Sequence, residues 1–152
     1  MIQKTIFYLR FGILFIFSLI MNSCSSDDGT ISCFPNSTIN STINLALPQY
    51  QNLLNPGGFV ETFGATGEGT RGLIIYRKSL TEFKVYDRNA PHLCPSEDTT
   101  LYVKNQLTID CPKDGANWNI NTGEPINGIS RSSPRVYFAN FNPSTNIIYI
   151  TN

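Results

Sequence analysis

The chain has 152 residues, of which 11 are basic and 11 are acidic, so its formal net charge at pH 7 is zero. Only 14% of the residues are charged, and no basic patch is present that could bind the phosphates of a nucleic acid. About 130 residues follow the N-terminal apolar segment, enough for one domain with one core. These values exclude a nucleic-acid-binding protein and an array of several domains.

The N-terminal residues have the pattern of a secretory signal. Lys4 and Arg10 are followed by an apolar run over residues 11–21. This run is shorter than the roughly 20 residues that a helix needs to span a bilayer, so we interpret residues 1–23 as a signal peptide. Its end, "LIMNSCSSDD", resembles a bacterial lipoprotein signal, in which Cys24 receives the lipid and becomes the mature N-terminus. The alternative is an ordinary cleaved signal that leaves Cys24 free.

A lipid on Cys24 would anchor the protein to a membrane through its acyl chains. Each buried methylene contributes about 0.8 kcal/mol, so more than one acyl chain gives an effectively stable attachment. The "SSDD" that follows resembles the acidic surface-export tag of some Bacteroidetes lipoproteins, with a solvated linker as the alternative. We therefore expect a lipid-anchored protein of the outer membrane in the cell envelope, exported to the surface if the tag acts, with residues 24–41 as its tether.

From Thr42 onward, short runs rich in β-branched and aromatic residues recur with turn residues between them. Lys104 and Asn105 separate two such runs, and Asn tolerates the positive φ that a tight hairpin requires. No window has a helical period of adequate length. We therefore predict an all-β domain over residues 42–152, a small sandwich or barrel of about eight to ten short strands. The clearest predicted strands are 42–47, 71–79, 82–88, 100–103, 106–110, 135–141 and 146–151.

Two segments between the predicted strands lack this alternation. They are "NAPHLCPSED", residues 89–98, and "CPKDGANWNINTGEP", residues 111–125. Their prolines and glycine are excluded from central ladders, so both segments are predicted to be loops. They contain the only histidine, His92, together with Cys94 and Cys111. Any metal or redox chemistry of the domain is therefore expected at these two loops.

The two loops resemble those of the Rieske iron–sulfur domain. In that family a [2Fe–2S] cluster lies between two loops, with two cysteines on one iron and two histidines on the other. The family motifs C-x-H and C-x-x-H fall on "APH", residues 90–92, and "CPKD", residues 111–114, with the hairpin of "TLYV" and "QLTID" between them. The resemblance implies a Rieske-like β-sandwich or barrel that carries a loop-bearing subdomain of the cluster-binding type.

The resemblance extends over about Thr42 to Asn152. "LPQYQNLLNPGGFVETF" and "GTRGLIIYRKSLTEFKVYDR" look like the opening strands of Rieske-like lipoproteins of Bacteroidetes. Trp118 stands at the usual aromatic position, and "NTGEPINGISRSSP" resembles the third loop that covers the cluster.

The family's ligand set is incomplete in this chain. His92 and Cys111 match the family pattern, whereas Ala90 replaces the first cysteine and Asp114 replaces the second histidine. Ala116 stands where the family often has a serine whose hydroxyl bonds to a cluster sulfur. The resemblance therefore implies that the standard cluster ligands are lost, and we expect no cofactor.

Cys94 leaves two further possibilities open. As a displaced ligand, it would complete a set of His92, Cys94, Cys111 and Asp114 that could hold a [2Fe–2S] cluster or a single zinc ion. As a disulfide partner in an exported protein, it would pair with Cys111 in the Rieske-like arrangement, which brings the loops together. Closing a loop of roughly 18 residues stabilises by about 3 kcal/mol. Cys33 would then be unpaired, although it could instead pair with either of the other two.

Other motifs have simpler interpretations. "GATGEGTRG", residues 64–72, has the glycines of a phosphate-binding loop but lacks its Lys-Ser/Thr ending and the following helix, so we interpret it as a turn. No nucleophile and base are paired by spacing, and His92 is interpreted as a hydrogen-bonding group rather than a pH sensor. We therefore expect a non-enzymatic structural or binding module of the cell envelope, with an unidentified envelope protein at its loop tip. The alternative is a [2Fe–2S] electron-transfer protein.

Overall fold

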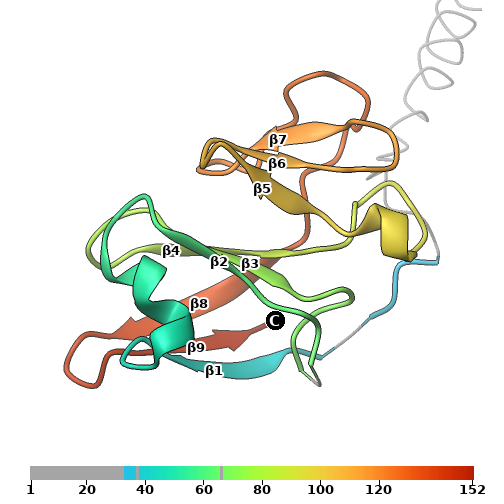
Figure 1. Ribbon diagram of the computed structural model, residues 1–152. Helices are drawn as coiled ribbons and strands as arrows, with labels where there is room; N and C mark the ends of the chain where they lie inside the picture. Colours follow the sequence, from blue (N-terminus) through green and yellow to red (C-terminus); the bar gives the residue numbers. More distant parts are fainter. Residues whose placement is uncertain (1–32, 37, 66) are drawn as a thin grey trace, which may run out of the picture.

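The computed structural model describes residues 33–36, 38–65 and 67–152, which form an all-β domain (Figure 1). The predicted all-β fold class is confirmed. Nine strands and two short 3₁₀ helices are found in this part of the chain. In chain order they are β1 Asn40–Asn44, η1 Pro48–Leu54, β2 Phe59–Glu61, β3 Leu73–Arg77, β4 Phe83–Asp87, η2 Glu97–Thr99, β5 Tyr102–Lys104, β6 Thr108–Asp110, β7 Asn117–Asn119, β8 Val136–Asn142 and β9 Ile147–Thr151.

Every strand predicted from the alternation overlaps an observed strand. The turn between β5 and β6 places Asn105 at φ 52° and Gln106 at φ 60°, so the tight hairpin forms one residue later than predicted. Two elements differ from prediction. β7 lies inside the predicted loop 111–125, and η1 occupies a segment that resembled an opening strand. Both are too short to display a period, and Pro48 at the start of η1 is compatible with a 3₁₀ turn.

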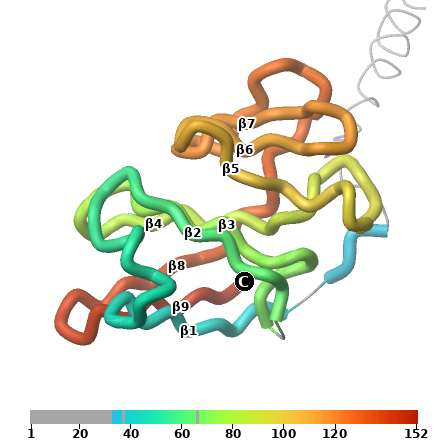
Figure 2. The backbone as a smooth tube through the Cα atoms, in the orientation of Figure 1, coloured from blue at the N-terminus to red at the C-terminus, as the bar shows by residue number. Residues whose placement is uncertain are grey.

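The larger sheet has six antiparallel strands in the order β1-β9-β8-β4-β3-β2. β4 and β8 pair over only two positions, Val85 with Tyr137 and Tyr86 with Val136, and the sheet curls at this junction. Figure 2 shows β1 and β9 side by side beneath the upper strands. The first core fills the inside of the curl, and its members include Ile43, Leu53, Leu73, Ile75, Val85, Ile148 and Ile150.

The three-stranded sheet, in the order β5-β6-β7, is inserted between β4 and β8 and lies over the outer face of β3 and β4. Ile74 and Tyr86 point from β3 and β4 into this second core, where they meet Ile109 and Trp118 of the small sheet. Since Leu73 and its alternate neighbours pack into the first core, β3 and β4 are buried on both faces. This arrangement matches the predicted loop-bearing subdomain.

A buried carboxylate connects the large sheet to the loops at its edge. Asp87, at the end of β4, is fully buried and accepts a hydrogen bond from the Tyr137 hydroxyl at 2.7 Å. It also accepts from the backbone N–H groups of Thr70 and Asn89, each at 2.7 Å. Three donors therefore compensate its loss of water. The glycine-rich turn and the first loop are both held against β4 by this one side chain.

The predicted signal peptide, Cys24 and the "SSDD" segment lie outside the described residues. β1 begins at Asn40, and Ile39 already packs into the first core, so the folded chain begins before residue 42, the start that we predicted for the domain. No helix in the described part of the chain has the length and apolar character needed to cross a membrane.

Candidate functional site

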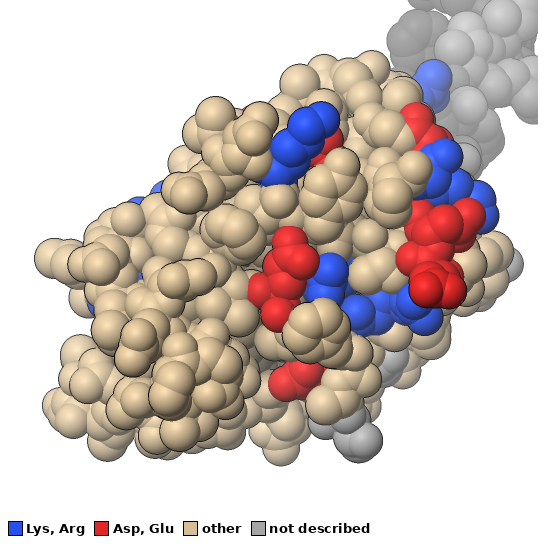
Figure 3. All heavy atoms as spheres, in the orientation of Figure 1, with Lys and Arg blue, Asp and Glu red and all other residues tan. Residues whose placement is uncertain are grey.

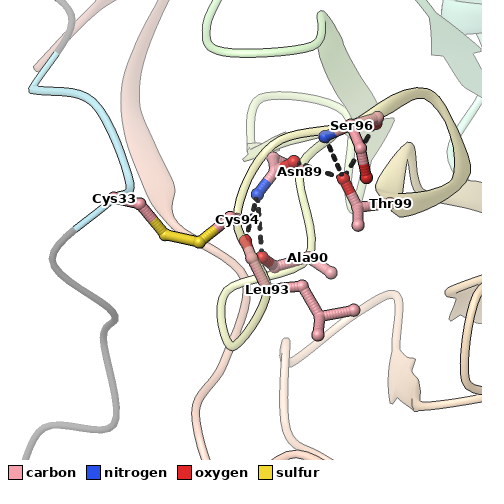
Figure 4. Close-up of a disulfide and its surroundings, with 7 residues drawn as sticks. All are labelled: Cys33, Asn89, Ala90, Leu93, Cys94, Ser96 and Thr99. Atoms are coloured by element: carbon pink, nitrogen blue, oxygen red, sulfur yellow. Dashed lines mark hydrogen bonds between the residues drawn. A yellow bond between two sulfur atoms is a disulfide. The ribbon is translucent and has the colours of Figure 1, made fainter.

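The first loop, residues 89–96, is held open by a buried asparagine. The Asn89 side chain donates to the carbonyls of Ala90 and Leu93 at 2.9 and 3.0 Å. Its own oxygen accepts from the hydroxyl of Thr99 at 2.8 Å (Figure 4). The Ser96 N–H in turn donates to Thr99 Oγ1, which completes a capping box at η2. These bonds fix the backbone that carries His92 and Cys94.

The second loop, residues 111–116, is a tight turn between β6 and β7. The Gly115 N–H donates to the Cys111 carbonyl, and the Cys111 N–H donates to the Ala116 carbonyl. Gly115 has φ 77°, a left-handed conformation that favours glycine. The Asp114 side chain accepts from the Ala116 N–H at 3.0 Å. The turn thus directs Asp114 toward the first loop.

The two loops meet through His92 and Asp114. His92 Nε2 lies 2.6 Å from Asp114 Oδ2. Burial alone would raise the pKa of Asp114, but the hydrogen bond from Ala116 and its contacts with His92 and Cys111 hold that pKa below its usual value. The carboxylate is therefore an acceptor, and Nε2 carries the proton. The imidazole also lies beside Trp118, with ring centres 5.9 Å apart.

Cys111 lies beneath this pair as a buried thiol. It is the free cysteine of the described chain and is 2% exposed. Burial raises the pKa of the thiol, and its contact with Asp114 raises it further, although backbone hydrogen bonds at Lys113 and Asp114 act against this. A buried thiol with a raised pKa is a poor nucleophile, because nucleophilic attack needs the thiolate.

The disulfide differs from the one predicted. Cys94 pairs with Cys33, with Cα atoms 5.4 Å apart, so the predicted Cys94–Cys111 bridge is wrong. Cys94 is on the exposed side of the first loop, whereas Cys111 is buried below it in the second core. Figure 4 shows the bridge leaving the first loop toward the segment that precedes β1. The disulfide therefore connects the first loop to the N-terminal segment rather than to the second loop.

The donor atoms do not fit a [2Fe–2S] cluster. Ala90 has no donor and is fully buried in the second core. The Cys94 sulfur is consumed by Cys33, which contradicts the alternative ligand set that included Cys94. His92 Nε2 and Asp114 Oδ2 contact each other, which leaves His92 Nδ1 buried without a hydrogen-bond partner in the described residues. In the described ranges, no group of three or more His, Cys, Asp or Glu residues could hold one metal ion, which also corrects the proposed zinc set.

Comparisons with known proteins give only distant likenesses. No protein-family model matches the chain, and no curated protein matches it. Two similar solved structures are the ferredoxin of carbazole 1,9a-dioxygenase from Nocardioides aromaticivorans IC177, 17% identical with a TM-score of 0.45, and a putative NADH-dependent nitrite reductase small subunit from Mycobacterium tuberculosis, 15% identical with a TM-score of 0.45. The alignments cover 75% and 76% of this chain and 96% of each of those chains. At this similarity, the chemistry of the loops rests on this chain's own side chains.

Several residues that organise the site were missed from the sequence. Asn89 and Thr99 hold the first loop, and both are fully buried. The spacing of Ser96 and Thr99 is a capping signal that was available. No comparable signal marks Asn89, because its partners are backbone carbonyls of its own loop.

Proposed function

We propose that this chain is a non-enzymatic binding or structural module of the cell envelope, built on a Rieske-like fold whose loop pair is closed by its own side chains. The observation that carries this proposal is the 2.6 Å contact between His92 Nε2 and Asp114 Oδ2. A charge-assisted hydrogen bond here joins the two loops directly. In the Rieske family a cluster would join them instead.

The second core supports the same proposal. Ala90, Cys111 and Ala116 from the two loops pack with Trp118 as fully or almost fully buried residues. An apolar methyl at position 90 favours this packing and supplies nothing to an iron atom. The loops therefore gain their order from burial and hydrogen bonds, which leaves the outer surface of the loop tip as the part able to contact a partner.

The disulfide would also orient the domain if Cys24 carries a lipid. Cys33 follows Cys24 by nine residues, which span at most about 30 Å when fully extended. Without the bridge, only the contacts of Phe34 and Pro35 with Arg135 precede the first core residue, Ile39, and a tether released from these contacts could reach about 50 Å. The Cys33–Cys94 bond would therefore hold the first loop closer to the membrane surface than the tether would hold it if the bond were absent.

Residues 25–152, produced in an oxidising compartment with iron supplied, test the loss of the cluster. Every residue of both cores lies between Ile39 and Ile150, so this fragment retains them all. We expect no stoichiometric iron or acid-labile sulfide and no visible absorption. About two irons and two sulfides per chain, with a paramagnetic signal on reduction, would contradict the proposal and favour an electron-transfer protein.

A matched variant shows whether the ligands alone decide the outcome. Ala90→Cys combined with Asp114→His restores the family pattern of two cysteines and two histidines. If the scaffold is otherwise retained, this variant binds iron and sulfide while the unchanged chain does not.

Membrane attachment is measured separately on the full chain by labelling with palmitate, which Cys24→Ser should abolish. Labelling that persists in Cys24→Ser would contradict the proposed anchor.

A further inference from the structure

A polar cleft lies at the glycine-rich turn, on residues that the loop pair does not use. Its volume is about 360 Å³, within the size range of small-molecule sites. The turn between β2 and β3 forms one wall, and the end of β4 and the start of η2 form the other. The residues around it are Phe63, Gly64, Thr70, Arg71, Arg88, Glu97 and Thr100.

Arg88 forms the rigid floor of this cleft. Its side chain is 9% exposed. It donates from Nε to the Leu101 carbonyl, from Nη1 to the Thr62 carbonyl and from Nη2 to Glu61 Oε2, at 2.9, 2.6 and 2.8 Å. A guanidinium has five N–H groups, so two remain for another acceptor. The geometry of this arginine is thus set before any ligand arrives.

Arg71 supplies a second, more accessible guanidinium. Its Nε donates to the Thr100 hydroxyl at 2.9 Å, which positions the side chain. Burial lowers the pKa of Arg88, Glu61 raises it, and Arg71 lowers it, so the two guanidinium groups lie close enough to repel each other. Within residues 33–36, 38–65 and 67–152, Arg71 forms no ion pair with a carboxylate. An anion placed between the two arginines would relieve this repulsion.

Two further residues, Phe63 and Thr70, line the same cleft. The hydroxyl oxygen of Thr70 is buried and has no hydrogen-bond partner in the described chain, although a buried hydroxyl is normally paired. Phe63 is 94% exposed, with its ring centre 6.0 Å from the Arg88 guanidinium. Glu97 adds one negative charge at the rim. Figure 3 shows basic side chains lying between acidic groups on this face of the molecule.

We propose that this cleft binds a small carboxylate that carries a planar apolar group. The carboxylate accepts hydrogen bonds from Arg71 and Arg88, and the planar group lies against Phe63. A carboxylate matches the forked donors of arginine. Its single charge is repelled less by Glu97 than the charge of a phosphate dianion. The cleft would serve as a ligand site of the module whether or not the loops hold a cofactor.

A titration of residues 25–152 with sodium benzoate, followed by ¹H–¹⁵N NMR spectra, tests this site. We expect saturable shifts in the amides of residues 63–72, 88 and 97–100. Benzamide has the same shape without the charge, so its affinity should be lower by a factor of about ten or more. Acetate lacks the ring and should also bind more weakly. Absence of saturable shifts, equal binding of benzamide, or stronger binding of inorganic phosphate than of benzoate would each overturn the proposal.

Matched variants locate the effect. Arg71→Gln should weaken benzoate binding by about tenfold, as expected for a lost charge-assisted hydrogen bond. Arg131→Gln removes the same charge from an exposed residue outside the cleft and should leave binding unchanged. Glu97→Gln should strengthen binding because it removes the like charge. Thermal unfolding of each variant checks that it is folded. Equal effects of Arg71→Gln and Arg131→Gln on benzoate binding would show non-specific charge attraction and would contradict the proposal.

Discussion

The two cores of this domain are built in different ways. The core inside the curled sheet consists mainly of strand residues, chiefly isoleucine, leucine and valine, together with Leu53 of η1 and with Ile39 and Leu45 on either side of β1. The core under the small sheet takes Ala90, Cys111 and Ala116 from loops and packs them around Trp118. The two loops therefore contribute side chains to a core, and within the described residues they form no group of three or more metal-binding side chains.

The two cores share β3 and β4, which are buried on both faces. Ile74 and Tyr86 belong to the second core, whereas Leu73, Ile75 and Val85 belong to the first. The shared strands are paired within the large sheet. The first core should therefore remain folded when the second core is damaged, whereas damage to the first core should also unfold the second.

The largest effect is expected from Trp118→Ala. Trp118 is fully buried, and its Nε1 donates to the Ser132 carbonyl at 2.8 Å. Its loss should cost about 4 kcal/mol of unfolding free energy. Hydrogen exchange should show lost protection in β5, β6 and β7 while β1, β8 and β9 keep theirs. Leu107→Ala, at a position 68% exposed in the turn between β5 and β6, is the control. Equal loss of protection in both sheets would contradict the asymmetry.

Asp87→Ala should destabilise the whole domain by about 3 kcal/mol. Its removal leaves the Tyr137 hydroxyl and the N–H groups of Thr70 and Asn89 without their acceptor inside the protein. Because β4 belongs to both regions, protection should fall in both sheets, which urea unfolding and hydrogen exchange would measure. Asp98→Ala removes only exposed contacts with Ser96 and Lys113 and should lower the melting temperature much less. If amide protection fell only in the small sheet, Asp87 would not be stabilising both sheets.

Removing the disulfide should cost about 2 to 4 kcal/mol, the usual range, because the bond constrains two residues that are 61 positions apart. Cys33→Ser and Cys94→Ser should destabilise equally, and the double variant no further. Thiol counting of the unfolded, unreduced chain from residue 25 onward should find Cys111 alone. If substitution of Cys111 abolished the bridge and left Cys33 as a free thiol, the Cys33–Cys94 pairing would be contradicted.

The smallest effect is expected from Tyr86→Phe, which should change the free energy of unfolding only at alkaline pH. Burial raises the pKa of Tyr86 to about 12, with Tyr76 adding to the shift, and its hydroxyl donates to the Ile120 carbonyl. Between about pH 10 and pH 12 the unfolded chain loses this proton while the folded chain keeps it, so stability falls as pH rises. Tyr86→Phe should remove part of that slope in urea unfolding. Tyr149→Phe, at an exposed position, should leave the slope unchanged.

Local pattern was sufficient to locate most strands, because alternation and turn residues act over a few neighbouring positions. Asn105 adopts the positive φ that its residue type tolerates, and β8 and β9 form the hairpin that their sequences indicate. β7 was missed because only three residues pair, and Trp118 was assigned to a loop. The short η1 segment likewise lacks a measurable period.

The side-chain partners in the loops depend on the path of the whole chain. His92 and Asp114 are separated by 22 residues, and Cys33 and Cys94 by 61. Spacing gave no reason to prefer Cys33 over Cys111 as the partner of Cys94. That choice follows from burial, since the fold places Cys111 inside the second core and leaves Cys94 on the outside.

By itself, the sequence determined the all-β class, the position of the two loops and the absence of donors at Ala90, because each depends on residue type or on short-range alternation. Only the tertiary structure decided that His92 meets Asp114, that Cys33 closes the disulfide and that Arg71 and Arg88 line one cleft. These contacts join distant segments, and their geometry is set by how the two sheets pack on β3 and β4.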